Sequence, residues 1–181
     1  MKGLRPLGIA ALSLASLTSC GGGSSPAAPT PVAVATPVPC TQATALEGSV
    51  SGLGSFVVVT APFTAGTAGR LDVFVDWTFA TTPIAVYVVR GTCSLEQLNA
   101  RTCDFVLRSE AATTPKPRKL SAPNVAAGNY LLIVGNAGTQ DEASSAVIQV
   151  SSASCPAFAA AGTVAQSAGE SVRYSAAKSW R

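Results

Sequence analysis

The sequence predicts an all-β fold, a single antiparallel β-sandwich, on three observations. Short runs rich in Val, Ile, Phe and Tyr recur through the middle of the chain, which is typical of strands. Clusters of Gly, Pro, Asn and Ser separate these runs, and only residues 94–101 have the pattern of a short helix. The 181 residues, 48% hydrophobic and 12% charged, suffice for one domain with a core, and this composition excludes a highly charged disordered chain.

Residues 1–19 have the features of a secretory signal peptide. Two basic residues, Lys2 and Arg5, precede a stretch of Leu, Ile, Ala and small residues. Only 14 residues separate Arg5 from Cys20, whereas a membrane-spanning helix needs about 20 apolar residues. We therefore expect this segment to direct export and to be removed, rather than to remain as a transmembrane anchor.

The segment ends with Leu17-Thr18-Ser19-Cys20, and Gly21 follows. These residues resemble the lipobox of bacterial lipoproteins, in which a branched apolar residue and two small residues precede Cys. The resemblance implies cleavage before Cys20, a diacylglyceryl group on its sulfur and a further acyl chain, such as palmitate, on the new amino group. Gly21 in place of Asp resembles the pattern for export to the outer membrane of a Gram-negative cell. The alternative is an ordinary secretory signal with an incidental Cys.

Residues 20–39 are predicted to form a lipidated Cys followed by a disordered linker. No charged residue lies between Gly21 and Pro39, and five prolines alternate with Ala, Val, Thr and Ser. This composition favours extended polyproline II, at ~3.1 Å per residue, over a packed core. A proline motif for the aromatic groove of a partner is the alternative.

The body, residues 40–155, contains six clear strand candidates and two weaker ones. The clear candidates are 55–60, 70–78, 84–90, 105–109, 129–134 and 146–151, and the weaker ones are 47–51 and 119–122. Six to eight strands with one short helix indicate two packed sheets.

The alternation of apolar and polar residues is clearest in 70–78. The apolar set is Leu71, Val73, Val75 and Trp77. Because successive side chains of a strand point to opposite faces, we expect this set in the core and the intervening Asp72 and Asp76 in solvent. The two acids are ~13 Å apart along a strand, which is too far for the paired carboxylates of a glycosidase.

Three segments follow one another in an order that resembles the bacterial pre-peptidase C-terminal (PPC) domain. They are 69–77 (GRLDVFVDW), 84–89 (IAVYVV) and 127–136 (AGNYLLIVGN). The resemblance covers roughly residues 45–151 and implies a small jelly-roll-like β-sandwich with a binding or accessory role rather than a catalytic one. In the second segment, family members often carry an acidic residue just before the apolar residues and the Tyr. This chain has Ala85 there and lacks that possible cation ligand, so we expect no metal site.

Four cysteines remain once Cys20 is assigned to lipid: Cys40, Cys93, Cys103 and Cys155. An even number in an exported chain predicts two disulfides, and four cysteines allow three pairings. We favour Cys93 with Cys103, which bracket a compact insertion, and Cys40 with Cys155, which bracket the predicted sandwich. The alternative, a zinc site, lacks both a CxxC motif and any His.

The absence of His makes an enzyme improbable on chemical grounds, because it removes the commonest general base and the Ser/His and Cys/His nucleophile pairs. We predict no catalytic residue and no cofactor. A hydrolase that uses a Ser with Lys116 or Lys119 is the alternative left open.

Three aromatic residues, Trp77, Tyr87 and Tyr130, are candidates for stacking on a sugar ring. Trp77 shares its phase with the apolar set of 70–78, so we expect its ring in the core, and the other two are ambiguous. A carbohydrate-binding or adhesion module is therefore the alternative function, and it requires these rings to be exposed.

Two loops carry polar clusters. Residues 136–142 have enough oxygen ligands for Ca²⁺ but lack the spacing of a calcium loop. Residues 116–119 (KPRK) form a basic cluster that we expect to be a solvated loop, with a contact to anionic headgroups as the alternative. Without Lys2 and Arg5 the chain has 10 basic and 9 acidic residues, so we expect no nucleic-acid partner.

Residues 156–181 are rich in Ala, Gly and Ser, and we expect a loosely ordered tail. The alternative is an additional strand at 171–175 or a partner contact through Trp180. Together these features predict a non-catalytic envelope lipoprotein. We expect it to be held at the outer membrane by Cys20, to face the periplasm or the cell surface, and to have a glycan or an envelope protein as its partner.

Overall fold

The computed structural model describes residues 39–152, 155 and 173–179. These residues belong to one compact unit, residues 37–181. The predicted signal peptide, Cys20 and most of the predicted linker lie outside the described residues, as do residues 156–172.

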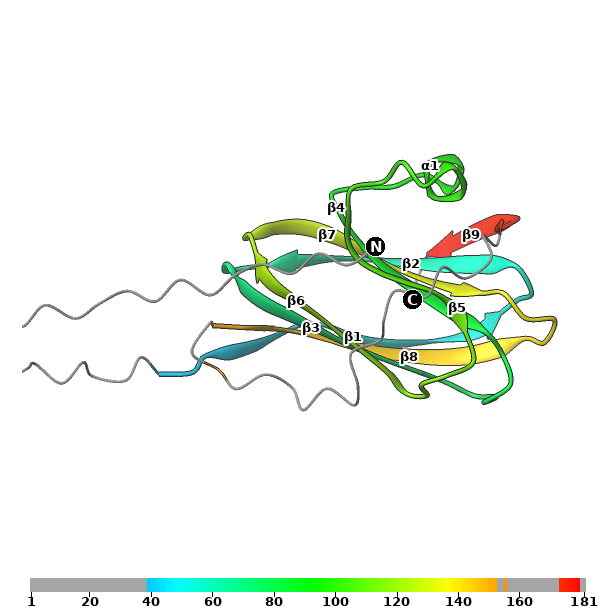
Figure 1. Cartoon of the computed structure of the whole chain (residues 1–181), viewed down its shortest axis with the longest axis horizontal. Helices are drawn as coiled ribbons and strands as arrows, with labels where there is room; N and C mark the ends of the chain where they lie inside the picture. Colours follow the sequence, from blue (N-terminus) through cyan, green and yellow to red (C-terminus); the bar gives the residue numbers. More distant parts are fainter. Residues whose placement is uncertain (1–38, 153–154, 156–172, 180–181) are drawn as a thin grey trace, which may run out of the picture. The chain divides into compact units, whose positions relative to one another are not determined.

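Two packed sheets form a β-sandwich, which confirms the predicted fold class (Figure 1). In order across the first sheet, the strands are β1 (Gln42–Leu53), β8 (Glu142–Ser151), β3 (Gly69–Trp77) and β6 (Arg118–Val125). In order across the second, they are β5 (Phe105–Ala112), β4 (Ile84–Arg90), β7 (Gly128–Asn136), β2 (Val57–Ala65) and β9 (Ala176–Ser179). All described pairs are antiparallel except β2 with β9.

The strand pairing is that of a jelly roll. β1 pairs with β8, β2 with β7, β3 with β6 and β4 with β5, so the chain forms one long hairpin with helix α1 (Leu95–Ala100) near its tip. The hairpin folds over so that β3 also pairs with β8 and β4 with β7. This arrangement places most consecutive strands in opposite sheets.

The main core lies between the sheets and follows the alternation that the sequence predicts. In β3 the set Leu71, Val73, Val75 and Trp77 is buried. A second apolar cluster lies on the outer face of the second sheet, where Leu98 of α1 and Tyr174 cover Tyr87 and Ile133. Because that sheet is covered on both faces, β4 is buried at six of its seven positions, which explains its continuous apolar run.

All six clear strand candidates and both weaker ones correspond to observed strands. Several strands extend beyond the predictions, β1 to Gln42–Leu53 and β2 to Ala65 among them. The short helix is also observed. Ser94 is its N-cap and forms a capping box with Gln97, and Arg101 ends it in the left-handed conformation, with φ 59°.

Both favoured disulfides are confirmed. Cys40 bonds to Cys155, and Cys93 bonds to Cys103. The first bond joins the chain just before β1 to the chain just after β8, the two strands that pair at one side of the first sheet.

The end of the chain differs from the expected loose tail. Residues 173–179 are ordered against the sandwich, Tyr174 is 4% exposed, and β9 extends the second sheet at β2. The alternative prediction of a strand at 171–175 is closer to the structure, but the observed strand begins at Ala176. The segment has no apolar alternation that could have located it, and one buried Tyr anchors it. Trp180 lies outside the described residues.

Candidate functional site

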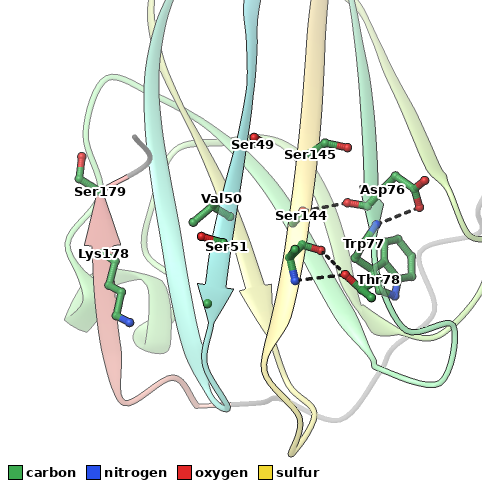
Figure 2. A pocket seen from close by; sticks show the side chains of 12 residues that line it. Ser49, Val50, Ser51, Asp76, Trp77, Thr78, Ser144, Ser145, Lys178 and Ser179 are labelled. Carbon is green, nitrogen blue, oxygen red and sulfur yellow. Dashed lines mark hydrogen bonds between the residues drawn. The ribbon is translucent and has the colours of Figure 1, made fainter.

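A groove of about 1080 Å³ opens where β1 and β3 end and β8 begins, and it extends to β9 (Figure 2). It is lined by Ser49, Val50, Ser51, Gly52, Asp76, Trp77, Thr78, Ala143, Ser144, Ser145, Lys178 and Ser179. We call it the serine-lined groove, because half of these residues carry a hydroxyl group. Two hydroxyls join β3 to β8: Ser144 Oγ donates to the Asp76 carbonyl at 3.0 Å, and Thr78 Oγ1 donates to the Ala143 carbonyl at 3.3 Å.

The remaining hydroxyls of the groove face outward. Ser49, Ser51 and Ser145 are exposed on the neighbouring strands β1 and β8, and Ser179 is exposed on β9. Each hydroxyl donates one hydrogen bond and accepts others, so this row suits an uncharged, hydroxyl- or amide-bearing ligand. Among the described residues, the charged side chains of the groove are Asp76 and Lys178, which come from different sheets.

Asp76 is held by an ion pair at the rim of the groove. Lys116 Nζ lies 2.7 Å from Asp76 Oδ1, and the backbone N–H of Trp77 donates to the same oxygen at 2.9 Å. The hydrogen bond from Lys116 lowers the pKa of Asp76 below its usual 3.8. Lys116 also lies over the Trp77 ring, 5.6 Å from its centroid.

Replacing Lys116 with Met is expected to raise the pKa of Asp76 toward 3.8, measured by an NMR titration of its carboxyl group. Because the folded pKa lies below the unfolded one, the pair stabilises the fold above the unfolded pKa, and this contribution is lost as the pH falls through the folded pKa. The pair is partly exposed, so we expect the effect at neutral pH to be below about 1 kcal/mol. Lys119→Met is the matched control, since Lys119 lies over Phe74 instead. An unchanged Asp76 pKa in Lys116→Met would contradict the assignment.

Asp72 is buried, which corrects the expectation that both acids of β3 are solvated. Its side chain is 3% exposed and pairs with Arg70 Nε at 2.9 Å, and the Ser121 hydroxyl also donates to it. Strand alternation correctly predicts that Asp72 points away from the core between the sheets. On the outer face of the sheet, however, Arg70 and Ser121 cover it. Asp72 and Asp76 each have their own cationic partner, so they form no acid–base pair.

Arg118 is buried as well, which corrects the expected solvated basic loop. It is 1% exposed, and its guanidinium donates to the carbonyls of Ile84, Glu110 and Ala112 at 2.5, 3.1 and 2.8 Å and to Ser109 Oγ at 3.1 Å. Arg118 thereby joins β6 to β4 and β5, across the two sheets, and its planar fork matches several acceptors at once.

Neither lysine of the open hydrolase alternative is paired with a nucleophile. Within residues 39–152, 155 and 173–179, Lys116 binds Asp76 and the Lys119 ammonium lies 5.9 Å from the Phe74 centroid, and neither donates to a Ser or Thr hydroxyl. Activation of a hydroxyl needs a base within hydrogen-bond reach, and neither lysine is so placed in this structure.

All three aromatic candidates are buried. Trp77, Tyr87 and Tyr130 are 3%, 4% and 2% exposed. Tyr130 stacks on Phe63 with centroids 5.6 Å apart, and its hydroxyl donates to the Ala126 carbonyl at 2.6 Å. They therefore form no exposed platform for a sugar ring, and the carbohydrate alternative loses the feature that it required.

Several polar groups of the loop 136–142 take part in hydrogen bonds within the protein. Asn136 Nδ2 donates to the carbonyls of Leu53 and Gln140 at 2.9 and 2.7 Å, and Glu142 accepts the backbone N–H groups of Thr78 and Phe79. The part of the chain that the structure describes holds no group of three His, Cys, Asp or Glu side chains suited to a metal.

Sequence reasoning missed a polar cluster centred on Glu110, on the outer side of the second sheet. Arg101 and Arg108 each place a guanidinium nitrogen 2.5 Å from Oε1 of Glu110, and the Tyr87 hydroxyl donates to Oε2 at 3.0 Å. Burial, reinforced by the charge of Glu110, raises the pKa of Tyr87. The spacing of Arg108 and Glu110, two residues apart in one strand, was the available signal, because such residues share a face.

A smaller apolar pocket of about 240 Å³ lies on the outer face of the first sheet. Phe74, Leu120 and Val147 contribute its apolar lining, with Lys119 and Gln149 beside them. It is separate from the serine-lined groove, with no lining residue in common.

Comparisons with known proteins show little similarity. No family model and no curated protein matches the chain. Among solved structures, the Yersinia pseudotuberculosis-derived mitogen is similar, with a TM-score of 0.38 and 13% identity over 61% of this chain and 86% of that one. Among the described helices, none has the length and apolar character to cross a bilayer.

Proposed function

We propose that this chain is a membrane-anchored envelope lipoprotein whose β-sandwich is a non-catalytic binding or accessory domain of the PPC type. The observation that carries the proposal is the pairing of the cysteines in disulfides. Two disulfides within the fold occupy Cys40, Cys93, Cys103 and Cys155, so Cys20 is the one cysteine of the sequence without a partner among them. Cys20 directly follows the signal-like segment, where a lipoprotein carries its lipid.

The arrangement of the sandwich supports a tethered binding module. The domain that the disulfide closes begins at Cys40. Residues 21–39, a proline-rich segment of 19 residues, allow up to ~60 Å between the lipid and the domain, at ~3.1 Å per residue. Two or three acyl chains at Cys20 hold a protein stably at a bilayer. The outer membrane is the proposed location, on the basis of Gly21.

The serine-lined groove is the proposed ligand site. Its exposed hydroxyls and the Asp76–Lys116 pair at its rim favour a polar, uncharged ligand, such as a backbone segment of an envelope protein. The two acids of β3 are held in ion pairs and Lys119 lies over an aromatic ring, which supports a non-catalytic role.

Intact-mass spectrometry of the membrane fraction tests the anchor. For the unaltered chain produced in a Gram-negative host, we expect a mass that begins at Cys20 plus an acyl increment, and a gain of about 4 Da on reduction of two disulfides. Cys20→Ala is expected to abolish both the increment and membrane association. Ser24→Ala, which lies just beyond the lipobox, is the control and retains both. A soluble, unacylated product from the unaltered chain would contradict the proposal and leave a secreted β-sandwich.

A further inference from the structure

The C-terminal strand β9 is an addition to a sandwich that is already closed. The eight jelly-roll strands end at Ser151, and the Cys40–Cys155 bond joins the chain ends of β1 and β8. β9 then pairs parallel with four residues of β2, from Val57 to Thr60, in a fold whose other described strand pairs are antiparallel. The strand β9 therefore forms the edge of the second sheet but does not belong to the long hairpin that makes up the jelly roll.

Tyr174 anchors this segment in a shaped socket. The ring is 4% exposed, whereas Arg173, Ser175 and Lys178 around it are exposed. Val58, Ile133 and Leu98 belong to the cluster that surrounds it. Gly135 forms the floor, because a Cβ atom at that position would lie only 2.5 Å from the Tyr174 ring, and the three atoms nearest to it all belong to the Tyr174 side chain.

The backbone beside Tyr174 is bound by groups that recognise any extended segment. Asn99 of α1 donates from Nδ2 to the Tyr174 carbonyl and accepts the Tyr174 N–H at Oδ1, both at 2.9 Å. The Ser175 N–H donates to the Phe56 carbonyl at 2.8 Å. The Cys93–Cys103 bond closes the loop that carries Asn99. Main-chain bonds along a sheet edge combined with one side-chain socket are the features of strand-addition sites.

We propose that this edge is a strand-acceptor site that takes residues 173–179 from a second copy of this chain, so that two copies associate by exchanging β9. We name the Gly135 floor, Asn99 and the β2 edge together the tail socket. The segment that fits the socket is present in every copy, and its described contacts are all noncovalent. The 17 residues between Cys155 and Arg173 can reach up to ~60 Å when extended, so exchange requires no change in the sandwich. The proposal does not depend on the lipid anchor.

Two full-length variants with complementary defects test the exchange. Tyr174→Ala leaves the socket open but removes the side chain that fills it. Gly135→Ala blocks the socket but keeps an intact tail. We expect each variant alone to sediment as a monomer and an equimolar mixture to form a one-to-one heterodimer at about 100 µM, a concentration suited to micromolar affinity. A mixture that remains monomeric would overturn the proposal.

A second experiment, with a peptide, tests whether the two copies make contact through the tail socket. A fluorescent peptide of residues 171–181 is expected to bind Tyr174→Ala, and to bind the double variant Gly135→Ala/Tyr174→Ala at least about tenfold more weakly. The double variant is expected to fold, because the three atoms nearest to the added Cβ atom all belong to the side chain that Tyr174→Ala removes. Should Gly135→Ala alone fail to fold, Asn99→Ala replaces it as the copy with an intact tail and a weakened socket. Equal binding of the peptide to both variants, or to a version with Ala in place of its Tyr, would also overturn the proposal.

Discussion

Replacing Arg118 with Met is expected to lower the free energy of unfolding by about 3–5 kcal/mol. Arg118 is 1% exposed, and its guanidinium donates to four buried or half-buried carbonyls and to the Ser109 hydroxyl. Met fills much of the volume but has no donor, so these acceptors lose their partners at a cost of about 1–3 kcal/mol each, offset in part because no charge remains to be buried. Urea unfolding followed by tryptophan fluorescence measures the change.

Two further variants separate geometry from charge at this position. Arg118→Lys keeps the charge but presents it at one point, so we expect it to recover only part of the loss. Arg90→Met is the exposed control: its side chain is 58% exposed with Asp104 at 4.0 Å, and we expect a change within about 0.5 kcal/mol. If Arg118→Met were no more destabilising than Arg90→Met, the carbonyls would not depend on the guanidinium.

Removing the Cys40–Cys155 bond by a double substitution to Ser is expected to cost about 5 kcal/mol of stability. The bond closes a loop with a sequence separation of 115 residues, and it therefore restricts the unfolded chain strongly. The Cys93–Cys103 bond, with a separation of 10 residues, is expected to contribute only about 3 kcal/mol by the same chain-entropy argument. Thermal unfolding of the two double variants without reductant compares them.

The order of the two effects is the informative result. If the loss at Cys93 and Cys103 equalled or exceeded the loss at Cys40 and Cys155, restriction of the unfolded chain would not be the main contribution of the longer bond. The hydrogen bond from Ser152 N–H to the Thr41 carbonyl, at 2.8 Å, lies beside that bond and would then be the next contact to alter.

Much of the fold followed from local patterns. The alternation in β3 predicted the buried positions of Val73 and Trp77, because strand geometry alone sends successive side chains to opposite faces. The disulfides were also predicted, since Cys93 and Cys103 are close in sequence and the remaining pair brackets the domain. The short helix was visible through Ser94 and its capping box.

The charged residues were predicted less well. Asp72 and Arg118 were both expected in solvent, and both are buried. Charge normally keeps a side chain exposed, and the exceptions depend on partners that no local pattern reveals. For Arg118 those partners are carbonyls of β4 and β5, as far away in sequence as Ile84.

The sequence by itself determined the class of fold and the signal-like start of the chain, because strand periodicity and composition are local properties. It favoured the disulfide pairing that the structure confirms, but four cysteines allow three pairings. Only the tertiary structure decided that Tyr174 fills a socket over Gly135 and that the serine hydroxyls of β1 and β8 lie side by side. Those arrangements depend on strand order in the jelly roll, which brings together residues as distant as Ser49 and Ser145. The burial of a polar side chain costs free energy unless hydrogen bonds compensate for it, and for Arg118 several of these bonds come from distant strands.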